Sequence, residues 1–271
     1  MTAGTQDPDP PQEIRNPSFR RSGVAPHGPT RLHWATATDP GRVRTANEDA
    51  CRAIPESGLF ILADGMGGSA AGALAADIVV QLLPDLLARR LKSNAVETSD
   101  DACSAIEASL SELSEMVLEK AETTPALLGM GSTVVTAWLR EQADVIAHMG
   151  DSRAYLLQKG RLNRLTQDHN LAQILDPAGQ PPAFGGEQLL RYIGMRSEPL
   201  PEARIISLDH GDRLLLCSDG LTNMLDDQTL ARILSSASAP RETCDELVTA
   251  ANRAGGRDNI TVMVLDVISP P

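Results

Sequence analysis

The chain has 271 residues, 42% of them hydrophobic and 3% aromatic, and its 36 acidic residues outnumber 24 lysines and arginines for a formal net charge of −12. This length fits one large domain with a tail. The acidic balance and the scarcity of aromatic rings argue against nucleic-acid binding, which needs a basic face and stacking platforms.

The cysteines are scattered along the chain, without the paired spacing of a zinc site: Cys51, Cys103, Cys217 and Cys244. We expect reduced, mostly buried thiols. We see no apolar run approaching the roughly 18 to 20 residues that span a bilayer, and no basic-then-apolar signal pattern at the N-terminus. These observations predict a cytoplasmic protein without a membrane partner.

Residues 1–30 are rich in proline and poor in apolar side chains. Such a segment buries too little surface to offset the entropy of ordering. We therefore predict a disordered tail over 1–30 and a folded domain over 31–269.

Short apolar runs of strand length follow, rich in β-branched residues or leucine. They are "GLFILADG", "STVVTAWLR", "DVIAHMGDSRAYLL", "DRLLLCSDG" and "NITVMVLDV". These runs predict a core built on β-sheet.

Helical patterns lie between the runs. The first begins in "AAGALAADIVVQLLPDLLARRL", where Pro84 is expected to kink or divide the helix. The second places Ile106, Leu110, Leu113 and Val117 on one face. A third is expected to start at Thr243, since Thr243 and Glu246 have capping-box spacing.

The order of these elements bears on the fold class. Strands and helices do not alternate one for one, so the pattern favours an α+β fold with antiparallel sheets covered by helices over a doubly wound parallel sheet.

The stretch "ILADGMGGSAAG" has three readings. Asp-Gly is a common turn. Gly65, Gly67 and Ala70 also satisfy a dinucleotide-binding spacing, although the second strand that this fold needs is missing and Asp64 would repel a pyrophosphate. The third reading is a metal site at a strand exit, where the glycines allow close approach.

Other acids recur at similar strand ends or tight loops, and oxygen ligands of this kind suit Mg²⁺ and Mn²⁺. They are Glu48, Asp49, Asp64, Asp151, Asp219 and Asp258. This recurrence favours the metal reading over a lone turn.

Several segments carry a family resemblance in order from about Leu32 to about Val267. They are "GRVRTANEDA", "ILADGMGG", "GMGSTVV", "AHMGDSRAYLL", "LTQDHN", "LLRYIGM", "LLLCSDGLTNML" and "GGRDNITVMVL". Together they resemble the metal-dependent Ser/Thr protein phosphatases of the PPM (type 2C) family in their bacterial form. The resemblance implies a four-layer α-β-β-α sandwich, with two antiparallel sheets flanked by helix pairs, over residues 31–269.

The resemblance also implies the metal ligands of a centre that holds two Mn²⁺ or Mg²⁺ ions. Asp64 would bridge both metals and the Gly65 carbonyl would bind one. Asp219 and Asp258 would complete the other shell, and Asp151 would join Asp219 at a third, weaker metal.

Further roles follow from the same motifs. Glu48, Asp49 and Asn259 would lie in an outer shell around the metals, where the two acids hold metal-bound waters. Arg44 would grip the substrate phosphate, so that Arg44, Asp64 and Asp219 form the catalytic set.

In family members, two cations about 3.5 to 4 Å apart activate a water that attacks phosphorus without a covalent phosphoenzyme. Many eukaryotic members carry a histidine where this chain has Met66, which cannot give a proton. His148 and His169 lie beside motifs, and we expect structural hydrogen bonds from both. Residues 176–195 fall where relatives have a mobile flap over the site.

The implied activity is hydrolysis of phosphoserine and phosphothreonine in proteins by a monomer, opposing a bacterial-type Ser/Thr kinase. Two rival readings stay open. A non-catalytic member would use the fold as a binding module, and a nucleotide-binding oxidoreductase would rest on the glycine spacing of the Asp64 loop.

Overall fold

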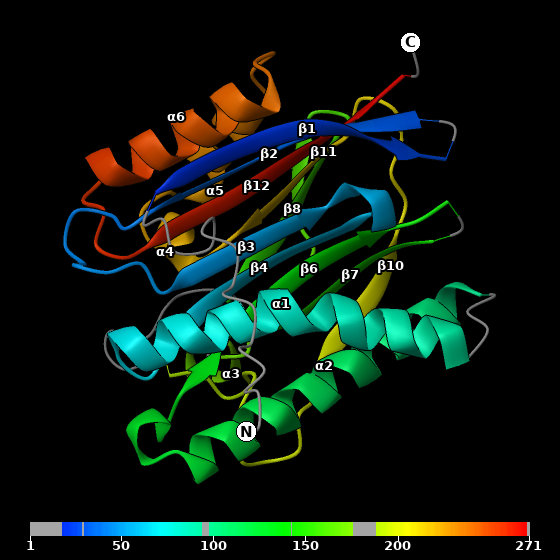
Figure 1. The fold of residues 1–271 in the computed structure, drawn as a ribbon. Coiled ribbons are helices and arrows are strands. Elements are labelled where there is room, and N and C mark those ends of the chain that lie inside the picture. The colour runs from blue at the N-terminus through cyan, green and yellow to red at the C-terminus, as the bar shows by residue number, and fades with distance from the viewer. Residues whose placement is uncertain (1–17, 29, 94–97, 142, 176–187, 270–271) are drawn as a thin grey trace, which may run out of the picture.

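The computed structural model describes residues 18–28, 30–93, 98–141, 143–175 and 188–269. Two antiparallel sheets lie face to face, with helices covering both outer faces (Figure 1). The expected α+β fold, a four-layer α-β-β-α sandwich, is confirmed.

The first sheet has the strand order β1-β2-β12-β11-β8-β9. Its strands are β1 Phe19–His27, β2 Thr30–Asp39, β12 Ile260–Ile268, β11 Arg213–Cys217, β8 Arg153–Gln158 and β9 Arg161–Arg164. Every neighbouring pair is antiparallel.

The second sheet has the order β10-β7-β6-β4-β3, and the short strand β5 also pairs with β4. Its strands are β10 Glu202–Ile206, β7 Asp144–Met149, β6 Val134–Leu139, β4 Leu59–Met66, β3 Asp49–Ile54 and β5 Gly131–Ser132. Because β4 pairs antiparallel with both β3 and β6, the glycine loop after it does not open a parallel βαβ unit. The dinucleotide-binding reading is therefore wrong.

The second sheet is covered by α1 and α2, and the first by α4, α5 and α6 (Figure 1). The helices are α1 Ser69–Ser93, α2 Ser99–Thr123, α3 Leu171–Leu175, α4 Asp219–Thr222, α5 Asp227–Leu234 and α6 Pro240–Arg253, with short 3₁₀ turns η2 Pro55–Ser57 and η3 Pro125–Leu127.

The core divides into three apolar layers, as a four-layer sandwich requires. One joins α1 and α2 to their sheet and holds the predicted α2 face, with Ile106, Leu110, Leu113 and Val117 fully buried. A second lies under α5 and α6. The third fills the space between the sheets, where the Trp34 and Phe60 rings meet edge to face 6.0 Å apart.

The expected boundary of the disordered tail at residue 30 is wrong. Phe19–His27 forms strand β1 and pairs in register with Thr30–Asp39. The segment has little apolar content, but an edge strand gains main-chain hydrogen bonds whatever its side chains, and Ala25 still packs in the layer between the sheets. Residues 1–17 lie outside the described residues.

Two expected helix boundaries also differ. Of the kink or division expected at Pro84, the division does not occur: α1 runs through Pro84, and Leu83 and Leu86 on either side of it are buried in the same core layer. α6 begins at Pro240 rather than Thr243, since proline fits the first helical turn. Glu242, not Glu246, accepts a hydrogen bond from the backbone N–H of Ala239 at the helix start.

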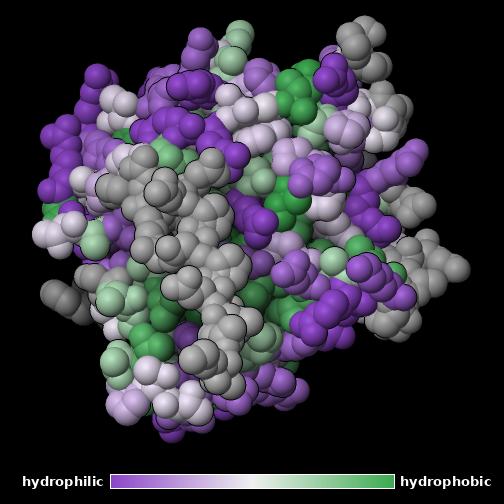
Figure 2. Space-filling model, viewed as in Figure 1, coloured by the Kyte–Doolittle hydropathy of each residue, from purple (hydrophilic) through white to green (hydrophobic). Residues whose placement is uncertain are grey.

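One helix among the described residues is long and apolar enough to cross a membrane by composition. It covers Ala70–Lys92, and an 18-residue window within it has a mean hydropathy of 1.6, so the expectation that no run approaches this length is too strict. Its residues Val79, Val80 and Leu83 pack against the second sheet as a core helix would. The face of the molecule in Figure 2 is largely hydrophilic, with apolar residues in separate small groups.

Candidate metal centre

Adjacent strands of the second sheet bring two carboxylates together. Asp49 on β3 and Asp64 on β4 are a register pair, and paired residues of antiparallel strands share one face. The Gly65 N–H donates to the Glu48 carbonyl at 3.2 Å. This hydrogen bond holds the start of β3 and the end of β4 together beside Asp49 and Asp64.

The first sheet delivers two further carboxylates to the same place. β11 ends at Cys217, and Asp219 opens α4 two residues later, while Asp258 lies just before β12. The Ser218 hydroxyl donates to Asp49 Oδ2 at 2.8 Å. This hydrogen bond joins the acid-bearing ends of the two sheets.

Asn259 holds the loop that carries Glu48. Its side-chain NH₂ donates to the carbonyls of Pro40 and Ala46 at 3.0 and 2.8 Å, and its Oδ1 accepts from the Glu48 N–H at 2.8 Å. Asn259 thus fixes the position of the loop 40–48 relative to the turn that carries Asp258.

Asp151 lies in the turn between β7 and β8, which belong to different sheets. Burial raises its pKa to about 7, and the charge of Asp219 adds to the rise. The sequence-predicted acids Asp64, Asp151, Asp219 and Asp258 therefore meet at one end of the sandwich.

The electrostatics of this cluster call for a cation. Burial raises the pKa of Asp64 well above its ordinary value, and the charges of Asp49, Asp219, Asp151 and Asp258 raise it further. Burial likewise raises the pKa of Asp49 to about 7. Carboxylates that crowd in this way either bind protons or share positive charge.

The residues present fit a hard divalent cation. All the clustered side chains offer oxygen, the donor that Mg²⁺ and Mn²⁺ prefer. Asp49 Oδ1 is buried and has no hydrogen-bond partner among the described residues. Asp64 and Asp219 are only partly buried, so the cluster stays open to ligands from solvent.

Two glycines allow β4 and α1 to meet beside the acids. A Cβ at Gly65 would lie 2.0 Å from the Gly72 carbonyl oxygen, and one at Gly72 would lie 2.1 Å from Glu48 Oε2. A side chain at Gly65 would therefore collide with the α1 backbone, and one at Gly72 would collide with the Glu48 carboxylate.

Arg44 lies at the cluster, with its Nη2 2.6 Å from Asp258 Oδ2 and its side chain about half exposed (49%). The hydrogen bond to Asp258 raises the pKa of Arg44, and Glu48 and Asp64 add to this. The guanidinium is thus a cation beside the carboxylates that can also reach solvent.

Sequence reasoning missed the hydroxyls that fix the backbone of Asp64. Thr133 Oγ1 accepts from the Asp64 N–H at 3.1 Å, and Ser132 Oγ donates to the Asp64 carbonyl at 3.0 Å. Thr133 Oγ1 also lies 2.7 Å from Ser152 Oγ, next to Asp151. The only sequence signal for these contacts is the Ser-Thr pair in "GMGSTVV".

Two other expectations concern neighbouring segments. His148 and His169 form hydrogen bonds outside the carboxylate cluster, to the Gln167 carbonyl and the Gly150 N–H. Of the expected flap over 176–195, residues 176–187 lie outside the described residues. Its last part is tied down by a bridge between Ser132 and Ile193.

Comparison with known proteins gives the same picture. The family model described as protein phosphatase 2C matches residues 42–252. The serine/threonine phosphatase stp of Listeria welshimeri is 35% identical over 244 residues, which cover 87% of this chain and 96% of the relative.

Solved structures are similar as well. PppA of Pseudomonas aeruginosa, a regulatory component of T6SS, superimposes with a TM-score of 0.76 at 30% identity, covering 91% of this chain and all (100%) of that one. The catalytic domain of the phosphatase PstP in complex with 2 manganese ions gives a TM-score of 0.71 at 34% identity, over 88% of this chain and 99% of the other. With a family match over most of its length and an acidic cluster that fits divalent cations, the chain belongs to the protein phosphatase 2C family.

Proposed function

We propose that this chain is a metal-dependent protein phosphatase that hydrolyses phosphoserine and phosphothreonine in proteins and opposes a Ser/Thr kinase. The observation that carries the proposal is the convergence of acids from both sheets on Asp64. Burial and the neighbouring negative charges raise the pKa of Asp64 well above its ordinary value. Such a cluster is built to be neutralised by divalent cations.

The ligand roles follow the position of each residue in the cluster. Asp64 and the Gly65 carbonyl would hold a pair of Mn²⁺ or Mg²⁺ ions from one sheet, and Asp219 and Asp258 would hold them from the other. Asp151 would share a third, weaker ion with Asp219. Glu48 and Asp49 would accept hydrogen bonds from waters around the ions, while Asn259 keeps their loop in place.

When bound, the cations supply a water nucleophile of lowered pKa and neutralise the charge that develops on the phosphoryl group. Arg44 binds phosphate oxygens through its planar fork of N–H donors. Its Nη2 donates to Asp258 Oδ2 here, which uses one of the five N–H donors of the guanidinium. Met66, paired with Gly131 on β5, has no proton to give, so the departing seryl or threonyl oxygen takes its proton from another donor.

The substrate class implies the surrounding chemistry. A phosphoprotein phosphatase acts after a kinase that phosphorylates the same serine or threonine side chains. We propose a cytoplasmic monomer that meets its phosphoprotein substrates in solution.

The direct test is an assay of the full chain on a phosphothreonine peptide. Activity should vanish with excess chelator and return with Mn²⁺ or Mg²⁺, since the carboxylates alone repel the phosphate. Turnover that persists in chelator would contradict the mechanism. A protein that binds Mn²⁺ in calorimetry yet never releases phosphate from any phosphopeptide would be a non-catalytic member.

A further inference from the structure

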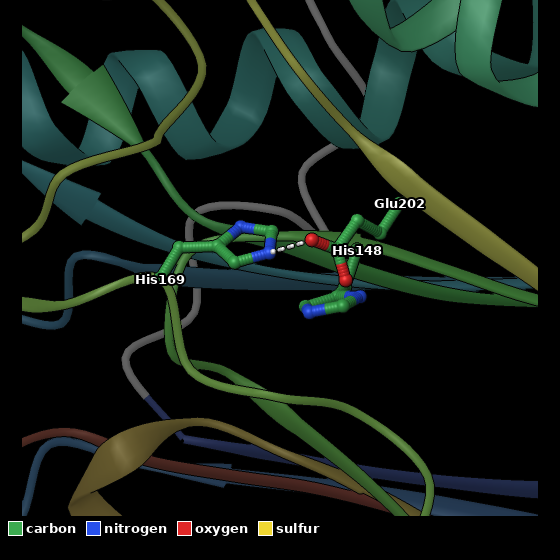
Figure 3. Close-up of side chains that lie close together, drawn as sticks. All are labelled: His148, His169 and Glu202. Atoms are coloured by element: carbon green, nitrogen blue, oxygen red, sulfur yellow. Dashed lines mark ion pairs between the residues drawn. The ribbon is translucent and has the colours of Figure 1, made fainter. Parts of the chain in front are cut away.

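A second cluster of titratable side chains lies beside the carboxylates and comes from three elements. His148 is on β7, His169 precedes α3 and Glu202 is on β10 (Figure 3). The two imidazole rings stack with centroids 4.5 Å apart, and His169 Nε2 lies 3.3 Å from Glu202 Oε1. Their ligand atoms are close enough together for a metal ion.

The hydrogen bonds speak against a metal at this place. The Gly150 N–H donates to His169 Nδ1 at 3.2 Å, so Nδ1 carries a lone pair and the proton of the neutral ring sits on Nε2. That proton points to Glu202. A metal on Nε2 would force the proton onto Nδ1, against the Gly150 donor.

The remaining contacts also leave no room for a cation. Arg191 Nη1 donates to Glu202 Oε1 at 2.6 Å and lies 3.4 Å from His169 Nε2, in the place that a metal would have to occupy. With the proton on Nε2, the longer of these two contacts is a close approach and not a hydrogen bond. His148 Nε2 donates to the Gln167 carbonyl at 2.8 Å. Burial lowers the pKa of His169 to about 4, so its ring is neutral at ordinary pH.

The contacts of His169 lead instead to Asp151. The backbone N–H of His169 donates to the Gly150 carbonyl at 3.0 Å. The main chain of His169 thus binds the Gly150 carbonyl, and its side chain binds the Gly150 N–H. Gly150 has a φ of 119°, a conformation open to glycine. The next residue is Asp151, whose carboxylate is hydrogen-bonded by Asn170.

The backbone carbonyl of His169 binds the segment that follows residue 187. It accepts from the Leu190 N–H at 2.8 Å and from the Arg191 N–H at 3.4 Å. His169 therefore connects the Asp151 turn to the chain leading to β10.

We propose that His169 is a positioning residue, which through its Nδ1 fixes the orientation of the Met149–Gly150 peptide at the start of the Asp151 turn and so sets the carboxylate of Asp151 for its cation. The proposal rests on the proposed function, in which Asp151 shares the weaker, third ion. Gly150, which precedes the ligand Asp151, gives the backbone of the turn conformational freedom. The hydrogen bond to His169 Nδ1 restricts this freedom. Outer contacts of this kind are worth roughly 10- to 100-fold in metal affinity.

Two substitutions separate the two ring nitrogens. In His169→Asn, the Oδ1 atom occupies the place of Nδ1 and still accepts from Gly150, while the contact with Glu202 is lost. In His169→Gln, the amide reaches toward Glu202 and the acceptor for Gly150 is lost. Glu202→Gln, which leaves Nδ1 untouched, is the matched control.

The readout is calorimetric titration of the full-length protein with Mn²⁺, after thermal melts establish that each variant is folded. We expect His169→Gln to weaken the weakest Mn²⁺ step about 10-fold, and His169→Asn and Glu202→Gln to stay within about threefold of wild type. An equal loss in the Asn and Gln variants, or none in the Gln variant, would overturn the role of Nδ1.

A measurement on the wild type does not depend on how the variants fold. The ¹⁵N chemical shifts of the His169 ring should report the neutral form protonated at Nε2; a proton on Nδ1 would refute the proposal. Failure of the underlying function looks different. Wild type without a weak Mn²⁺ step, or an Asp151→Asn variant that keeps every step, would remove the third ion itself.

Discussion

Asp49 on β3 and Asp64 on β4 stand opposite each other as a register pair at the ends of neighbouring antiparallel strands. The pairing puts two carboxylates on one face of the sheet at the point where the other sheet adds Asp219. Each charge raises the pKa of its neighbours, on top of the effect of burial. The site is therefore electrostatically unfavourable without cations.

This strain predicts the pH dependence of the metal-free protein. The folded-state pKa values of Asp49 and Asp151 rise from 3.8 to about 7, so the folded state binds protons more tightly than the unfolded chain. The resulting stability is fully present below about pH 4 and is lost as the pH rises through about 7.

Thermal melts in chelator should show this loss as a fall in Tm of about 5 °C or more between pH 5 and pH 8. Saturating Mn²⁺ should raise Tm at pH 8, because cations replace the protons. A metal-free Tm that stays constant or rises over this range would show that the carboxylates do not repel one another in solution.

Replacing Asp219 with asparagine should remove most activity while the fold is kept. Asparagine keeps the shape but not the charge that holds a cation, and a lost metal contact is worth several kcal/mol of transition-state stabilisation, or at least about 100-fold in rate. Phosphopeptide turnover at saturating Mn²⁺ is the measurement. Glu115→Gln, which alters an exposed carboxylate on α2, is the control and should keep full activity.

Arg44 should matter for phosphate binding through both charge and shape. We expect Arg44→Ala to raise KM for a phosphothreonine peptide about 10-fold and Arg44→Lys to raise it less, since lysine keeps the charge without the fork. The exposed neighbour Arg42 is the matched control, and Arg42→Ala should leave KM near wild type. Equal effects at the two positions would mean that general charge, rather than Arg44, attracts the substrate.

Gly65→Ala should strongly destabilise the protein, by about 3 kcal/mol or more. Its Cβ would lie 2.0 Å from the Gly72 carbonyl oxygen, which belongs to the backbone of α1 and cannot turn aside. In Gly72→Ala the nearest atom is the end of the Glu48 side chain, which can move. Denaturant unfolding should therefore rank Gly65→Ala well below Gly72→Ala, and the reverse ranking would disprove the close approach.

The thiols should be nearly unreactive in the folded protein. Burial raises the pKa of Cys51 and of Cys217 to about 12, and raises that of Cys244 as well. Cys103, like Cys51, is only partly buried, but burial raises its pKa less than that of Cys51. Titration with a thiol reagent should label Cys103 first and all cysteines after denaturation. Rapid native labelling of Cys217 would contradict the packing under β11.

Much of the site could be predicted because its acids follow recognisable strands. The apolar runs before Asp64 and Asp219 mark β4 and β11, and the burial of the α2 face followed from its period. Strand β1 could not be predicted in this way, because an edge strand depends on the partner β2 rather than on its own apolar content.

The start of α6 and the hydroxyl contacts escaped for a similar reason. Thr243 does not cap the helix; its hydroxyl donates to the carbonyl of Ala239, the residue before α6, and accepts from Arg213 on β11. Thr133 binds the Asp64 backbone across 69 residues of sequence. Contacts of this range depend on how the sheets stack, which local spacing does not encode.

The strands of each sheet pair only with strands of the same sheet, whereas the acids at the shared end of the sandwich come from both sheets. Cations at that end would thus cross-link layers that are otherwise held together chiefly by apolar side chains. With ions bound, opening one layer means releasing them, so the sandwich should exchange its amide hydrogens as a single cooperative unit. Without bound ions, the same layers can open separately. The catalytic ions would therefore also stabilise the fold.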